Sequence, residues 1–159
     1  MTSCCSAPEE VALWQKRLAS QANNRAWALA ELHNRTPEED EEMLQAAHAA
    51  MYFWKIVGVA NNRAHAAQLV AHVYALLGLP NPAKHYLRQS QPFFLDQTCA
   101  PREQAFAHAV SANVAAAAGE NEAHVRHYHE AERLVASLVD EEDRKILNAT
   151  MSVIPAPIM

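Results

Sequence analysis

The 159-residue sequence has few glycines, few cysteines, few basic residues and no long apolar segment. Three glycines leave little scope for the tight turns that join strands, whereas helix-forming alanine is abundant, so we expect an all-α fold. Three cysteines are an odd number, and Cys4 and Cys5 are neighbours. No disulfide framework is therefore expected, and a reducing compartment is the simpler setting.

The charge and hydropathy patterns exclude two classes of partner. With 13 basic and 18 acidic residues, the chain has no Lys/Arg stripe that would displace counterions from a nucleic acid. The most apolar stretch, residues 46–60, is interrupted by His48 and Lys55 and is shorter than the roughly 20 residues of a membrane span. The first residues carry neither the basic start nor the apolar run of a secretory signal. We therefore expect a cytoplasmic protein that binds neither nucleic acid nor membranes.

Apolar residues recur at spacings of three and four along most of the chain, which predicts about seven helices. The expected helices cover residues 9–33, 37–57, 61–77, 81–91, 101–119 and 121–138, with a short seventh from residue 140. Capping boxes at residues 6–9 and 36–39 start the first two. Residues 46–54 are apolar on almost all sides and should lie between other helices.

The length fits a single domain over residues 1–159. We expect residues 1–7 to form a flexible tail. Residues 151–159 are an apolar tail that either docks as a strap or frays.

A short segment is repeated. Residues 73–78, Val-Tyr-Ala-Leu-Leu-Gly, recur 41 residues later as Val-Ala-Ala-Ala-Ala-Gly. A period of 20 to 50 residues with two helices per unit is typical of stacked helical repeats.

Small and large residues around the two glycines resemble the packing positions of the tetratricopeptide repeat (TPR) family. They are Val70, Ala71, Tyr74, Gly78, Ala83 and Leu87, followed by Ala112, Gly119, Tyr128 and Ala131. The resemblance covers residues 62–138, and residues 36–74 are also similar to small bacterial TPR-like proteins that have no assigned activity. It implies antiparallel helical hairpins stacked as a short right-handed superhelix, with a concave groove that binds extended peptides in relatives.

In the TPR-like register, six residues are expected to line the groove: His65, Gln68, His72, Phe106, Ala109 and Asn113. The lysine-rich clamp that holds a peptide carboxylate in some relatives is absent from these positions, so an acidic C-terminal ligand is disfavoured. The leading prediction is an interaction module that captures an extended or helical protein segment.

Two alternatives stay open. One is a self-associating structural protein, such as a homodimer in which residues 151–159 cover a neighbour's groove. The other is a small-molecule or metal protein that uses His48, His65 and His72. His48 needs a hydrogen-bond partner if it is buried, and a pocket is the alternative to a satisfied core histidine. The residues of that predicted pocket are His48, Tyr52, Trp54 and Arg63.

The sequence does not indicate an enzyme, a cofactor or a metal. Nine histidines are present, but none stands in His-Glu-x-x-His or Glu-x-x-His spacing, and there is no Cys-x-x-Cys. No Gly-x-Ser-x-Gly occurs, and Cys99 has no histidine close in sequence. Gly58, Gly78 and Gly119 lie too far apart to form a phosphate-binding loop.

Overall fold

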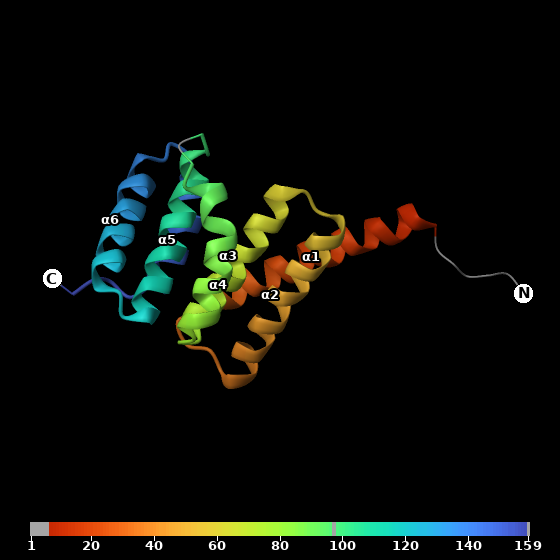
Figure 1. Ribbon diagram of the computed structural model, residues 1–159, viewed down its shortest axis with the longest axis horizontal. Coiled ribbons are helices and arrows are strands. Elements are labelled where there is room, and N and C mark those ends of the chain that lie inside the picture. Colours follow the sequence, from red (N-terminus) through yellow and green to blue (C-terminus); the bar gives the residue numbers. More distant parts are fainter. Residues whose placement is uncertain (1–6, 97, 159) are drawn as a thin grey trace, which may run out of the picture.

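The computed structural model describes residues 7–96 and 98–158, and within these ranges all regular secondary structure is α-helix (Figure 1). The prediction of an all-α fold with seven helices is confirmed. The helices are α1 (Pro8–Ala30), α2 (Pro37–Val57), α3 (Ala60–Leu76), α4 (Pro80–Phe94), α5 (Pro101–Ala118), α6 (Asn121–Ser137) and α7 (Glu141–Ser152).

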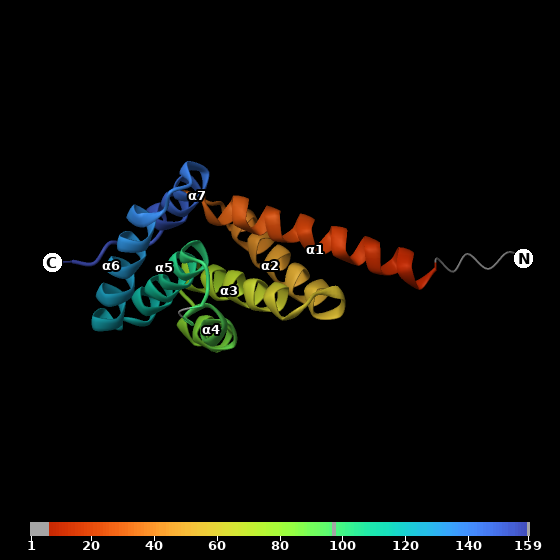
Figure 2. The same ribbon diagram turned by 90° about the horizontal axis from the view of Figure 1, so that it is seen from above.

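Consecutive helices pack in pairs, and the pairs stack along the molecule. Helix α1 packs against α2, α3 against α4, and α5 against α6, while α2–α3, α4–α5 and α3–α5 contacts join the pairs. Helix α7 packs on α5 and α6. Figure 2 shows the start of α1 at one end of the molecule and α6 at the other. The Ser152 hydroxyl at the end of α7 lies 3.3 Å from His33 Nε2, beyond the end of α1.

Local sequence accounts for several helix ends. Thr36 and Glu39 form the predicted capping box: Thr36 Oγ1 accepts from the Glu39 N–H, and Glu39 Oε2 accepts from the Thr36 N–H, at 3.2 and 2.9 Å. Gly78 and Gly119 have φ of 70° and 71°, a left-handed conformation that ends α3 and α5 and turns the chain into the next helix. The predicted cap at Ser6 lies outside the described residues.

Helices α3 and α5 form the centre of the molecule, because both are buried on most sides. Leu69, Val70 and Val73 of α3 pack with residues of α1 and α2, while Ala71 and Ala75 pack with Val110 and Val114 of α5. Their many alanines let neighbouring helices approach closely. The sequence prediction that residues 46–54 would lie between other helices and not on the surface holds for Ala47 and Ala50, which are buried, but is wrong for Tyr52, which is exposed, and Trp54 is half-buried. Other helices cover α2 only in part.

Two predicted helix ends differ from the structure: α1 ends at Ala30 and not at residue 33, and α4 ends later than residue 91. Helix α4 continues through Pro92 to Phe94, and Phe94 is fully buried beside Ala64 and Ala107. A proline removes one backbone donor, and here the burial of the Phe94 ring stabilises the last turn. The chain after α7 is docked as far as Ile154, which is buried against α5 and α6, and His124 Nε2 donates to the Pro155 carbonyl at 2.7 Å.

Candidate functional site

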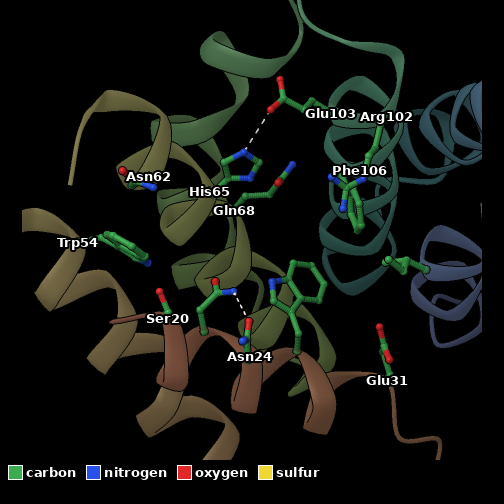
Figure 3. A pocket seen from close by; sticks show the side chains of 13 residues that line it. Ser20, Asn24, Glu31, Trp54, Asn62, His65, Gln68, Arg102, Glu103 and Phe106 are labelled. Carbon is green, nitrogen blue, oxygen red and sulfur yellow. Dashed lines mark hydrogen bonds and ion pairs between the residues drawn. The ribbon is translucent and has the colours of Figure 1, made fainter. Parts of the chain in front are cut away.

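A cleft of about 490 Å³ lies between α1, α3, α5 and α7, with one residue from the end of α2 (Figure 3). Helix α1 supplies a stripe at helical spacing, and the other helices face it. The lining residues are Ser20, Asn23, Asn24 and Trp27 of α1, Glu31 at its C-terminal cap, Trp54 of α2, Asn62, His65 and Gln68 of α3, Arg102, Glu103 and Phe106 of α5, and Ile146 of α7.

Three aromatic rings shape the cleft. Trp54 and Phe106 lie on opposite sides of it (Figure 3). The edge of Trp27 contacts Phe106, with ring centroids 5.7 Å apart and planes at 62°. Trp27 also stacks on His72, at 5.5 Å and 29°. Because His72 is completely buried, it holds the Trp27 indole ring in place on the side away from solvent. This aromatic part of the cleft is therefore preformed.

Of the charged residues of the cleft, the cation has an ion-pair partner and the carboxylates do not have a full one. Arg102 forms an ion pair of 2.8 Å with Asp143 of α7 and lies 5.7 Å above the Phe106 ring. His65 Nε2 lies 3.4 Å from Glu103 Oε1. Burial lowers the pKa of His65 more than Glu103 raises it, so this imidazole is mostly neutral at pH 7. The Glu103 carboxylate therefore has no full positive charge opposite it.

Glu31 is the second carboxylate of the cleft. It lies one helical turn after Trp27, and no ion pair or side-chain hydrogen bond to it occurs within the described residues. Partial burial raises its pKa from the ordinary value, as expected of a carboxylate that water and cations reach only incompletely. A cation placed here would therefore be attracted by the Glu31 carboxylate, and Trp27 lines the same cleft with an aromatic ring that favours cations.

The structure brings together only half of the predicted groove residues. His65, Gln68 and Phe106 line the cleft. His72, Ala109 and Asn113 are buried away from the cleft, and the expectation that they would line the groove is wrong for these three; Gln68 borders the cleft although it is only 2% exposed. His72 and Asn113 lie where α3 and α5 pack together, whereas Ala109 packs with Ala131 of α6 and Met151 of α7, so all three are hidden from a partner.

Asn113 and His72 bind each other in this buried layer. Asn113 Nδ2 lies 3.0 Å from His72 Nδ1 and 3.3 Å from the His72 carbonyl, so the amide donates and Nδ1 accepts. The proton of the neutral ring is then on Nε2, which has no hydrogen-bond partner among the described residues. Burial, together with the nearby charge of Arg35, lowers the pKa of His72 to about 3. The role that follows from these contacts is structural support of Trp27.

The predicted pocket of His48, Tyr52, Trp54 and Arg63 does not exist as one site. His48 Nε2 is 2.8 Å from the Tyr74 hydroxyl, and this bond satisfies the histidine without a ligand. Tyr52 is exposed, and Arg63 donates to the Gly58 carbonyl at 3.0 Å. Trp54 belongs to the cleft. His48 and Trp54 are six residues apart on α2, which places them on different faces of the helix.

Sequence reasoning missed the contribution of α1. The stripe of Ser20, Asn24, Trp27 and Glu31 has helical spacing, and this is the only sign of it in the sequence. The resemblance to TPR repeats starts at residue 62 and does not include α1. The repeat pattern therefore did not indicate which face of α1 would line the groove. Packing of α1 against α2 and α3 turns it toward the cleft.

Other reactive groups do not form a centre. The part of the chain that the structure describes holds no group of three or more histidine, cysteine, aspartate or glutamate side chains placed to bind a metal. His108 and His127 form a pair, with their Nδ1 atoms 2.9 Å apart. The Cys99 thiol donates to the Phe93 carbonyl at 3.0 Å, and the pKa of the thiol is raised, chiefly by burial, which disfavours the nucleophilic thiolate.

Over residues 7–96 and 98–158, the chain has no helix with the length and apolarity needed to cross a membrane. Comparison with family models, with curated proteins and with solved structures finds no match for this chain.

Proposed function

We propose that this chain is a TPR-like interaction module that binds an extended, basic protein segment in the cleft. The observation that carries the proposal is the cleft itself, in which preformed aromatic rings lie beside carboxylates that lack full counter-charges. The packing of helices in pairs, with α1, α3, α5 and α7 all facing the cleft, supports the TPR-like part of the proposal.

The shape and polarity of the cleft favour a peptide backbone. Its volume of about 490 Å³ suits a few residues of extended chain. Four side-chain amides line it: Asn23, Asn24, Asn62 and Gln68, of which Gln68 is almost completely buried and Asn62 Oδ1 already accepts from the Val59 N–H. An amide side chain both donates and accepts, so it can pair with the N–H and C=O groups of a peptide whatever its side chains are. Trp27, Trp54 and Phe106 offer surfaces for apolar and cationic side chains.

The charges favour a basic segment. Asp143 neutralises Arg102, whereas Glu31 and Glu103 face the cleft without a matching cation. An arginine or lysine of the ligand would supply the missing charge and stack on an indole ring. An acidic segment would instead place like charges together, which is the usual means of rejecting a wrong partner.

Selection from a randomised peptide library displayed on phage tests this proposal. We expect peptides enriched in arginine and lysine, and titration calorimetry of a selected peptide should show that Glu31→Gln and Glu103→Gln each weaken binding by roughly 3- to 10-fold. Glu122→Gln, which removes the same charge from α6 outside the cleft, is the matched control. Enrichment of acidic sequences, or equal binding by the Glu31 and Glu122 variants, would overturn the proposal.

A further inference from the structure

The starting half of α1 carries an uncovered apolar stripe. Val11, Trp14 and Leu18 are spaced by three and four residues and therefore lie on one face of the helix. This face differs from the cleft stripe, which contains Ser20, and from the face of the buried Ala19.

Helix α2 extends the same surface. Arg25, one heptad after Leu18, binds Glu42 of α2 through two hydrogen bonds of 2.6 and 2.8 Å, so this side of α1 borders α2. Ile56 lies two heptads after Glu42 and hence on the same side of α2, with Tyr52 one turn before it. We call this surface the end face; its residues are Val11, Trp14, Leu18, Tyr52 and Ile56, which are 42% to 61% exposed.

Such an end face is unusual for a stacked helical array. The outer side of a terminal helix pair is normally polar, because it is not covered by a further pair. Here Figures 1 and 2 show the start of α1 at the extreme end of the molecule, with none of the other helices lying over it. Contiguous exposed apolar side chains of this kind mark an interaction surface.

The charges beside the stripe favour one kind of partner. Glu10 and Arg17 are one heptad apart and flank the stripe on the same side. The Arg17 guanidinium carbon lies 5.2 Å from the centroid of the Trp14 ring, so this side chain leans over the stripe. If two copies of α1 pack antiparallel about a two-fold axis near Trp14, Glu10 of each copy meets Arg17 of the other, and Val11 of each meets Leu18. The surface is therefore complementary to itself.

We propose that the end face binds a second copy of this chain, with the two α1 helices antiparallel and two symmetric Glu10–Arg17 ion pairs at the edge. The pairing leaves the cleft open, because the cleft stripe lies on a different face of α1. It is therefore independent of the proposed peptide binding.

Sedimentation equilibrium of the full chain at low salt, over a wide range of protein concentration, tests whether this dimer forms. We expect a concentration-dependent species of twice the 17.6 kDa chain mass. Trp14→Glu should shift it to the monomer, and circular dichroism should show unchanged helix content because this side chain is half exposed. A monomer at every concentration, or a dimer that survives Trp14→Glu, would overturn the proposal.

Charge reversal tests the antiparallel register. Glu10→Lys and Arg17→Glu should each weaken association by roughly 10-fold or more, because each creates two like-charge pairs. The double variant, which carries both Glu10→Lys and Arg17→Glu, should restore the association. The controls Glu9→Lys and Lys16→Glu make the same charge changes on the far side of α1 and should leave the mass unchanged. If the double variant stays as weak as the single ones, the antiparallel arrangement is wrong.

Discussion

Replacing the buried His72 by leucine is expected to make the protein less sensitive to mild acid. The pKa of His72 is about 3 in the folded chain, because burial disfavours the imidazolium, against an ordinary value of 6.5. The unfolded chain thus binds a proton below pH 6.5 that the folded chain does not. Stability is complete above this pH and falls as the pH falls toward 3.

The size of this effect follows from the two pKa values. Each pH unit between them changes the free energy of unfolding by about 1.4 kcal/mol, so His72 alone accounts for a loss of about 2 kcal/mol between pH 7 and pH 5. That is a large part of the roughly 5 to 15 kcal/mol that stabilises a typical domain. Most carboxylates remain ionised in this range, so they add little to the difference.

Urea denaturation followed by circular dichroism at pH 8, 7, 6 and 5 measures how the free energy of unfolding changes with pH. In His72→Leu the imidazole no longer stacks on the Trp27 ring, so the free energy of unfolding at pH 7 will differ between the variant and the parent protein. The informative quantity is the change between pH 7 and pH 5, which should be about 2 kcal/mol smaller in the variant. Between pH 8 and pH 7 the two curves should be parallel, because the histidine is neutral in both states. Equal losses in the parent and the variant below pH 7 would refute the reasoning.

Four further substitutions test the packing and the turns by the same urea assay. Phe94→Ala should cost roughly 3 to 5 kcal/mol, since the ring is fully buried at the end of α4; a cost under about 1 kcal/mol would mean that α4 ends earlier. Gly119→Ala should cost roughly 1 kcal/mol from the left-handed backbone alone, because nothing lies within 4 Å of an added Cβ, and Gly78→Ala should match it. Ile154→Ala should cost roughly 2 to 4 kcal/mol, and an unchanged midpoint would show that the tail does not stabilise the fold.

Local features that depend on neighbouring residues were predictable from the sequence. The Thr36–Glu39 capping box and the glycines that end α3 and α5 follow from hydrogen-bond and backbone rules that act over a few residues. The helix ends that differ, at Ala30 and Phe94, depend on contacts with distant segments. Local rules carry no information about such contacts.

The site was only partly predictable, because exposure depends on which helices pack together. His65, Gln68 and Phe106 line the cleft, but His72 and Asn113, on the same two helices, are sealed between α3 and α5. Alanine-rich helices show a weak amphipathic pattern, since alanine is tolerated both in a core and at a surface. The pattern alone therefore does not distinguish a groove position from a buried one.

The sequence by itself determined that the chain is helical and where most helices start, because alanine content, apolar spacing and caps act locally. Only the tertiary structure decided which faces meet: it placed the Trp27 and Glu31 stripe of α1 in the cleft and left the Trp14 stripe at the end of the molecule uncovered. The physical reason is that a helix with residues of mixed polarity on several sides has several faces that are able to pack. Burial against the other helices selects among them.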